Sequence, residues 1–169
     1  MANRWTRLLK HRLLDEGDAE RVLGAGALER IAQRVGASER RHSGEIRVCV
    51  EAGLPWSYIR RAASPRERAV AMFGKLRVWD TEHDNGVLIY LLLAEHAIEI
   101  VADRGLNRHV DAAEWARIAA TMRAAFQGGQ FEAGLNQAVD AVDGLLSRHF
   151  ALPADQANPN ELPDLPERR

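Results

Sequence analysis

Two polar segments flank the most hydrophobic part of the chain and carry its best candidates for chemistry. Residues 84–86, an Asp-Asn-Gly sequence, come directly before the apolar run 87–94. The next apolar run, 97–102, leads straight into Asp103. If the two runs are antiparallel strands joined by a tight turn, the start of the first and the end of the second share one sheet edge. This geometry predicts that the carboxylates of Asp84 and Asp103 lie together.

The oxygen-bearing side chains expected at this edge suit a hard divalent cation. Glu45 begins the preceding strand, and it joins Asp84, Asn85 and Asp103 as a candidate metal ligand. Calcium and magnesium prefer such oxygen ligands, so either fits better than zinc. Ordinary turn chemistry is the alternative interpretation, because Asp-Asn-Gly sequences are common in turns without any ligand.

The opposite end of the sheet offers a second candidate site. Ligands of open α/β sheets usually bind at the carboxyl ends of the parallel strands, which here means the loop 52–63. Five side chains in or next to this loop are candidates: Glu51, Trp56, Tyr58, Arg60 and Arg61.

The elements that position these residues alternate between strand and helix. Residues 45–51 alternate apolar and polar side chains, as a half-buried strand does. The sequence Ser-Pro-Arg-Glu at 64–67 has the form of a helix capping box, and an apolar helical face follows it. A strand, a helix and a second strand form a crossover unit, which makes the two strands parallel. We therefore predict an α/β fold: a small mixed β-sheet, with a parallel crossover unit plus an antiparallel hairpin, flanked by helices on both faces.

Helical periodicity divides the remaining chain. Residues 1–17 are predicted to form an N-terminal amphipathic helix, with apolar Trp5, Leu8, Leu9 and Leu13 on one face, and residues 18–150 to form the α/β domain. One helix is expected from about residue 18 to Ser43, one beginning after the cap at Asp111, and one over 131–150. The proline-rich segment 151–169 is predicted to be disordered.

Composition restricts the function classes. The chain has 169 residues and a net charge of −1, which gives no large field to attract nucleic acid. Cys49 is the only cysteine, so a cysteine-based zinc site is not expected. The first residues lack the apolar core of a signal peptide, and no apolar run is long enough to be a transmembrane segment. We expect a cytoplasmic protein.

The order of these motifs resembles the TPM domain family, which includes thylakoid-lumen phosphatase-like proteins and many bacterial membrane-associated proteins. The similar segments are 84–89, 103–106, 125–135 and the Ser-Gly entry at 43–44, within roughly residues 18–150. The resemblance implies an α/β sandwich with a small mixed sheet, a divalent-metal site near the Asp-Asn-Gly loop and, in some members, acid phosphatase activity. Family members commonly carry an export signal and often a membrane anchor, so this chain resembles a cytoplasmic branch.

Of the candidate ligands, only residues 84–86 carry over from the family pattern, whereas Asp103 and Glu45 follow from the expected hairpin geometry. The resulting hypothesis is metal-assisted hydrolysis of a small phosphorylated substrate. A cation held by Asp84 and Asp103 would polarise a phosphoryl oxygen, Arg104 would bind a phosphate oxygen, and His83 would transfer a proton.

The alternative function is a non-catalytic interaction module. Residues 4–13 would then bind a protein partner, or attach the chain to a membrane surface, through the apolar face of the first helix. The absence of a Gly-x-Ser-x-Gly nucleophile sequence favours this alternative.

Overall fold

The fold is a mixed sheet with helices on both faces, in a computed structural model that describes residues 7, 8, 11, 16–153 and 155–169. Within these residues the helices and strands, in chain order, are α2 (Glu16–Leu23), α3 (Ala27–Ser38), β1 (Ile46–Glu51), α4 (Trp56–Arg60), α5 (Pro65–Lys75), β2 (Val87–Leu92), the 3-10 turn η1 (Leu93–Glu95), β3 (Ala97–Ala102), α6 (Arg104–Asn107), α7 (Ala112–Gln127), α8 (Phe131–His149) and β4 (Glu167–Arg168). This architecture confirms the predicted fold class.

The strand order is β3-β2-β1-β4, and β3 lies at one edge. β1 and β2 are parallel, with Ile46 opposite Val87, whereas β2 and β3 are antiparallel, with Val87 opposite Ala102. Between them η1 and His96, which has a left-handed backbone, reverse the chain. The start of β2 therefore lies beside the end of β3, as the hairpin prediction requires.

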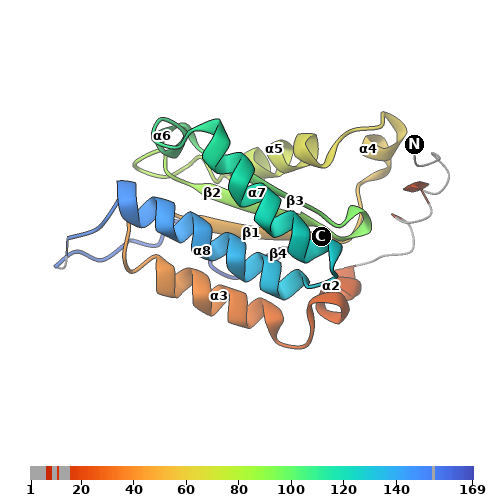
Figure 1. Ribbon diagram of the computed structural model, residues 1–169, viewed down its shortest axis with the longest axis horizontal. Coiled ribbons are helices and arrows are strands. Elements are labelled where there is room, and N and C mark those ends of the chain that lie inside the picture. Colours follow the sequence, from red (N-terminus) through yellow and green to blue (C-terminus); the bar gives the residue numbers. More distant parts are fainter. Residues whose placement is uncertain (1–6, 9–10, 12–15, 154) are drawn as a thin grey trace.

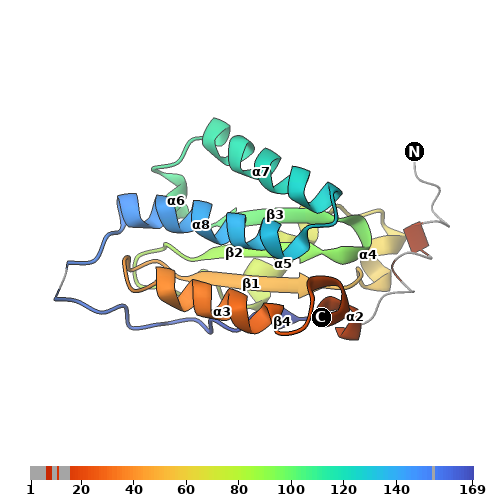
Figure 2. The same cartoon turned by 60° about the horizontal axis from the view of Figure 1, so that its bottom comes forward.

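Helices form two layers around this sheet. α3, α7 and α8 cover one face, and α5 covers the other (Figures 1 and 2). Strand side chains alternate between the two layers, so Ile46, Val48 and Val50 join the core under α3 and α8. Cys49 and Tyr90 pack on the α5 side. Burial on both faces explains why the central strands are almost continuously apolar.

Local capping fixes the starts of two helices that adjoin the sheet. The Ser64 hydroxyl accepts from the Glu67 N–H at 3.1 Å, and the Glu67 carboxylate accepts from the Ser64 N–H at 3.0 Å. These reciprocal bonds form the predicted capping box of α5. Asp111 likewise accepts from the N–H of Glu114 at 2.7 Å and begins α7.

The long helix expected from about residue 18 to Ser43 is instead two helices, so this prediction was wrong. Gly24 and Gly26 have left-handed backbones, with φ of 97° and 69°, and break the helix between Leu23 and Ala27. Apolar residues on both sides of the break still join one core, which explains why the periodicity continued across it. Glycine's freedom at positive φ outweighed that periodicity.

β1 is buried along its whole length, rather than half-buried as its alternating pattern predicted. The two charged residues that suggested an exposed face have specific partners. Arg47 donates to the carbonyl oxygens of Pro163 and Leu165, and Glu51 pairs with Arg68. Charged side chains on a strand therefore marked buried ion pairs and backbone contacts here, not solvent exposure.

The C-terminal segment is part of the sheet edge, which differs from the disorder that its composition predicted. Its end forms β4, which pairs in parallel with β1 and places Glu167 opposite Cys49 (Figure 2). Glu45 fixes the segment by accepting from the Leu162 N–H at 3.1 Å. These contacts link positions more than a hundred residues apart, so composition alone does not reveal them.

The predicted first helix lies largely outside the described residues. Of residues 1–17 the structure describes 7, 8, 11, 16 and 17. The predicted apolar face over residues 4–13 therefore lies mostly outside the described residues. Among the described helices, none has both the length and the hydropathy needed to cross a membrane.

Candidate functional site

The loop before β2 and the turn after β3 are joined by two backbone hydrogen bonds. The Asp103 N–H donates to the Gly86 carbonyl at 2.9 Å, and the Gly105 N–H donates to the Asp84 carbonyl at 2.8 Å. The hairpin therefore brings residues 84 and 103 to one edge of the sheet, as predicted.

Two glycines make this close approach sterically feasible. A Cβ at Gly105 would lie 2.4 Å from the Asp84 carbonyl oxygen and 2.6 Å from that of His83. A Cβ at Gly86 would lie 1.9 Å from the Val78 carbonyl oxygen. Any side chain at either position would push the loops apart, so glycine is a packing requirement at both.

The loop over residues 80–85 is held by its own side chains. The Thr81 hydroxyl accepts from the Asn85 N–H at 3.1 Å, and Asp84 has a left-handed backbone with φ of 52°. Aspartate tolerates this conformation better than most residues, because its short polar side chain forms local hydrogen bonds. The left-handed position therefore has a suitable residue, and its side chain lines a hollow beside this loop.

A hollow of about 420 Å³ opens between this loop and the turn after β3. Six residues line it: Trp79, Asp80, Thr81, Asp84, Asp103 and Arg104. Three carboxylates and one hydroxyl thus surround a space that is large enough for a hydrated cation. Trp79 is about half exposed and forms part of the rim.

Arg104 neutralises one of the three carboxylates. Its Nε lies 2.9 Å from Oδ2 of Asp84 and its Nη2 lies 3.1 Å from Oδ1. The guanidinium holds the pKa of the Asp84 carboxyl below its usual value, chiefly through these hydrogen bonds. The Arg104 side chain is 71% exposed, so this pair sits at the solvent edge of the hollow.

Asp103 keeps one oxygen without a partner. Its Oδ1 accepts from the Arg104 N–H at 2.7 Å and caps α6, whereas its Oδ2 is enclosed and has no hydrogen-bond partner among the described residues. An enclosed carboxylate oxygen without a donor is unfavourable unless a cation, a water or a proton satisfies it. Oδ1 of Asn85 and Oε1 of Glu45 are likewise enclosed without a partner among the described residues, but of these three residues only Asp103 lines the hollow.

The other predicted ligands have different environments. Asn85 is buried under the loop and donates to the Ser43 hydroxyl at 3.2 Å, away from the residues that line the hollow. Glu45 is buried, its carboxylate accepts from the Leu162 N–H, and it does not line the hollow. His83 is exposed and does not line the hollow. Of the predicted set, the structure therefore brings together Asp84, Asp103 and Arg104.

Sequence analysis missed Thr81 and Trp79 as lining residues. The Thr81 hydroxyl enters the lining through its bond to the Asn85 N–H, and neither this residue nor Trp79 carries a motif that singles it out in the sequence.

The fit to a metal ion is therefore partial. In the part of the chain that the structure describes, no three histidine, cysteine, aspartate or glutamate side chains are close enough to hold an ion together. The hollow offers two neighbouring carboxylates, of which Asp84 is paired with Arg104. A third carboxylate, Asp80, is paired with Arg77, and the Thr81 hydroxyl completes the oxygen atoms of the lining. Such a set suits a cation that keeps several water ligands, as magnesium usually does, or a flexible calcium site.

At the second candidate site, at the carboxyl ends of the parallel strands, Glu51 belongs to a buried network, whereas Trp56, Arg60 and Arg61 are exposed. Arg68 donates to both carboxylate oxygens of Glu51, at 2.6 and 2.9 Å, and the Tyr90 hydroxyl donates to Glu51 at 2.5 Å. Burial raises the pKa of the Tyr90 hydroxyl. All three groups have partners inside the core under α5, so this end of the sheet presents no free reactive group from Glu51.

The described part of the N-terminal segment contacts its own domain. Arg7 and His11 both bond to the carboxylate of Glu95, at 2.7 and 2.9 Å, and His11 Nδ1 accepts from the Leu54 N–H at 3.0 Å. These residues fix the segment beside the β2–β3 turn.

The chain is similar to one protein family and to a solved bacterial structure. The family model of the TPM domain matches residues 17–145. The NMR structure of the BA42 protein from the psychrophilic bacterium Bizionia argentinensis is similar, with 27% sequence identity and a TM-score of 0.73 over 86% of this chain and 94% of that one. The comparison with curated proteins finds no match.

Proposed function

The chain belongs to the TPM domain family, and we propose that in this member the hollow between Asp84 and Asp103 binds a divalent cation, calcium or magnesium. The enclosed, unpartnered Oδ2 of Asp103 is the observation that carries this proposal. A cation near this atom would satisfy an oxygen that otherwise lacks any donor.

The lining supports a cation over an anion. Three carboxylates line the hollow, from Asp80, Asp84 and Asp103, whereas Arg104 is the one cationic side chain in the lining. Arg77 pairs with Asp80 from outside the lining, so Asp103 is the carboxylate without a cationic partner among the described residues. Carboxylate and hydroxyl oxygens are the ligands that calcium and magnesium prefer. Among the described residues the Arg104 guanidinium hydrogen-bonds to Asp84 alone, and its side chain is 71% exposed, so it can move aside when a cation takes its place.

Calorimetric titration with calcium and with magnesium tests this directly. We expect saturable binding to the wild-type protein, and loss of at least tenfold in affinity for Asp103→Asn and Asp84→Asn. Asp155→Asn is the matched control, because Asp155 is exposed and lies outside the hollow. Equal heats for wild-type and Asp103→Asn protein would rule out binding at this hollow.

A phosphomonoesterase activity at the same hollow is the second candidate function. The exposed guanidinium of Arg104, at the rim beside two carboxylates, favours it, because arginine binds phosphate oxygens in a forked geometry. A bound cation would supply polarisation of a phosphoryl oxygen and activation of water. Arg104 would orient the phosphate, while Asp84 and Asp103 would hold the cation.

The proton-transfer role of His83 has less support, since His83 is exposed and outside the lining. Turnover of an aryl phosphate with added magnesium, compared with an Asp84→Ala, Asp103→Ala double variant, tests the activity. Equal rates for the two proteins would remove the enzymatic function and leave cation binding to be judged by the titration.

A partner-binding role for residues 4–13 remains the alternative function. The anchoring of Arg7 and His11 on Glu95 would present this segment beside the β2–β3 turn. Deletion of residues 1–13 separates the two proposals, because cation affinity should be unchanged if the hollow alone binds the ion. Loss of liposome binding or of a co-purifying partner in the same deletion would support the alternative.

A further inference from the structure

β3 is an edge strand with one row of backbone groups that faces away from the sheet. In the antiparallel pairing with β2, the Asp103 N–H bonds to Gly86, so alternate residues before Asp103 bond to β2 in the same way. The residues between them, Ile98, Ile100 and Ala102, direct their N–H and C=O groups outward. The edge therefore offers the backbone pattern that another strand would use.

Two of the three outward carbonyls, those of Ile100 and Ala102, accept hydrogen bonds from side chains, whereas the outward N–H groups have no such partner among the described residues. Arg66 of α5 donates to the Ile100 carbonyl, and the Asn107 amide donates to the Ala102 carbonyl at 2.7 Å. No acceptor among the described residues bonds to the N–H of Ile98, Ile100 or Ala102. The free edge is thus left with unpaired donors.

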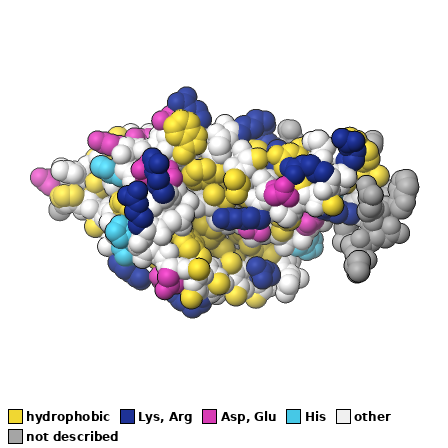
Figure 3. Space-filling model, turned by 90° about the horizontal axis from the view of Figure 1, so that it is seen from above, with side chains coloured by type: hydrophobic (Ala, Val, Ile, Leu, Met, Phe, Trp, Pro, Cys, Tyr) yellow, Lys and Arg dark blue, Asp and Glu magenta, His cyan; other side chains and the backbone are white. Residues whose placement is uncertain are grey.

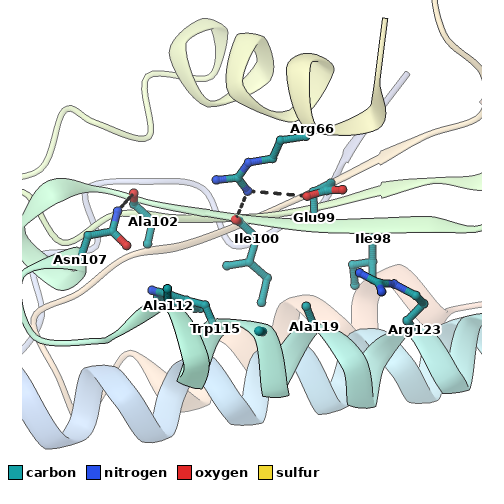
Figure 4. Close-up of a pocket in the computed structure, with 11 residues that line it drawn as sticks. Arg66, Ile98, Glu99, Ile100, Ala102, Asn107, Ala112, Trp115, Ala119 and Arg123 are labelled. Carbon is teal, nitrogen blue, oxygen red and sulfur yellow. Dashed lines mark hydrogen bonds and ion pairs between the residues drawn. The ribbon is translucent and has the colours of Figure 1, made fainter.

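A groove of about 360 Å³ lies between this edge and α7. Apolar side chains form its walls, with Ile98 and Ile100 from β3 and Trp115, Ala116 and Ala119 from α7. The close-up shows the α7 side chains directed toward the strand, with Arg66 approaching from α5 on the other side (Figure 4). In the space-filling view of this side of the molecule, hydrophobic side chains gather in a hollow with lysine or arginine side chains around it (Figure 3).

The polar groups of the groove are mostly donors. Arg123 lines it and attracts the charge of Glu99, but no hydrogen bond from its guanidinium is found among the described residues. The Trp115 Nε1 atom is enclosed and likewise has no acceptor among those residues. Glu99 is the one carboxylate in the lining, and Arg66 already approaches it at 3.7 Å. A ligand rich in hydrogen-bond acceptors would match this surplus of donors.

We propose that the groove between β3 and α7 binds an extended, acidic peptide segment of a partner protein, which adds to the open edge of β3 and places a carboxylate against Arg123. The peptide's carbonyls would accept from the outward N–H groups of Ile98, Ile100 and Ala102. Its apolar side chains would pack on Trp115 and the alanines of α7. Strand addition of this kind takes affinity from main-chain bonds and specificity from alternate side chains.

Two other occupants are less compatible with these groups. A second copy of the chain would place its own β3 and Arg66 against the groove, which adds cations beside Arg66 and Arg123. A helical segment would leave the three outward N–H groups without acceptors, because its carbonyls are bonded within the helix. Both remain outcomes of the experiment below.

Selection from a displayed library of random octapeptides, followed by synthesis of the enriched peptides, tests the proposal. We expect enriched peptides that alternate apolar residues with Asp or Glu. Ala116→Trp should fill the groove and weaken their binding at least tenfold, measured by fluorescence anisotropy. Ala120→Trp is the matched control, since Ala120 is also exposed on α7 but does not line the groove, and it should change affinity less than twofold.

Arg123→Ala should weaken binding of the acidic peptides by roughly tenfold, the loss that one charge-assisted hydrogen bond represents, and should leave their neutral Asn and Gln analogues almost unaffected. Amide hydrogen exchange gives the second readout. A bound strand should protect the amides of Ile98, Ile100 and Ala102, whereas Glu99 and Val101, already bonded to β2, should not change.

Three results would overturn the proposal. The first is a selection with no enrichment over the Ala116→Trp protein. The second is enriched peptides that bind without protecting the three outward amides, which would indicate a helical or otherwise different ligand. The third is concentration-dependent dimerisation that Ala116→Trp abolishes, without peptide binding, which would assign the groove to a second copy. Circular dichroism and melting temperature confirm that each variant is folded.

Discussion

Asp84 and Arg104 are 20 positions apart, yet the carboxylate accepts two hydrogen bonds from the guanidinium, at 2.9 and 3.1 Å. This pair exists because the hairpin brings the loop before β2 against the turn after β3. A cation in the same hollow must compete with Arg104 for the Asp84 oxygens. Arg104 is therefore a built-in competitor of the proposed cation.

Removal of this competitor should strengthen cation binding. Arg104→Ala frees both Asp84 oxygens and removes one positive charge, so we expect calcium affinity to rise by roughly three- to tenfold at low ionic strength. Arg34→Ala is the matched control, because Arg34 of α3 forms the same kind of two-bond pair with Asp140 of α8, and neither residue lines the hollow. Weaker calcium binding by Arg104→Ala in calorimetry would show that Arg104 supports the site and does not compete for it.

Glycine at position 105 should be essential for the meeting of the two loops. Gly105→Ala places a Cβ against the Asp84 and His83 carbonyl oxygens, so we expect a loss of about 1–3 kcal/mol in the free energy of unfolding. Gly144→Ala, in the exposed middle of α8 with nothing within 4 Å, should instead be neutral or stabilising by up to about 1 kcal/mol. Urea denaturation of both variants measures the difference, and equal stabilities would contradict the packing argument.

The core and the hairpin followed from the sequence because they depend on local signals. Residues 64–67 carry a capping box in their side-chain types, and the apolar run 87–94 can only be a buried strand or helix. The proximity of Asp84 and Asp103 then follows from strand pairing alone. Arg104 was also assigned to this edge, but its bond to Asp84 was not, because side-chain pairing depends on rotamers that sequence does not specify.

Two differences between the predictions and the structure share a physical cause, the contacts of the C-terminal segment. Glu45 was placed with Asp84 because both lie near strand starts, but its carboxylate bonds to the Leu162 N–H, which comes from the segment predicted to be disordered. The same segment supplies the carbonyls that bind Arg47. Contacts with a distant tail override local patterns, and only the three-dimensional structure reveals them.

The buried ion pair under α5 should be far more important for stability than a neighbouring exposed one. Arg68→Ala leaves the Glu51 carboxylate buried with only Tyr90 as donor, so we expect a loss of about 3–5 kcal/mol. Arg61→Ala removes a similar guanidinium over the Tyr58 ring, but its partner Glu67 is exposed, so stability should change little. Thermal denaturation compares the two variants. Similar losses for both would mean that burial is not the deciding factor.

The raised pKa of the Glu39 carboxyl predicts that the free energy of unfolding falls as the pH rises. Burial raises the pKa of its carboxyl from 4.5 to about 9, with smaller contributions from Glu45 and Asp164. Between these values the unfolded chain has lost the proton while the folded protein keeps it, so folding becomes less favourable by at most about 1.4 kcal/mol per pH unit. Below about pH 4.5 both states hold the proton and the effect disappears.

Glu39→Gln removes this titration and keeps an oxygen that can accept from the Ile46 N–H. The variant should gain stability relative to wild type steadily from pH 5 to pH 9, as measured by urea denaturation. The exposed control, Glu29→Gln, should show a constant difference over the same range. A flat difference for Glu39→Gln would mean that Glu39 is ionised in the folded protein.

Amide chemical shifts during a calcium titration test the cation-binding proposal most directly. In nitrogen-15 correlation spectra of the wild-type protein, we predict saturable shifts centred on residues 80–86 and 103–105, and their loss in Asp103→Asn. The predicted shifts include the Gly105 N–H, which bonds to the Asp84 carbonyl. Shifts that are absent, or that centre on another part of the molecule and persist in Asp103→Asn, would contradict the account.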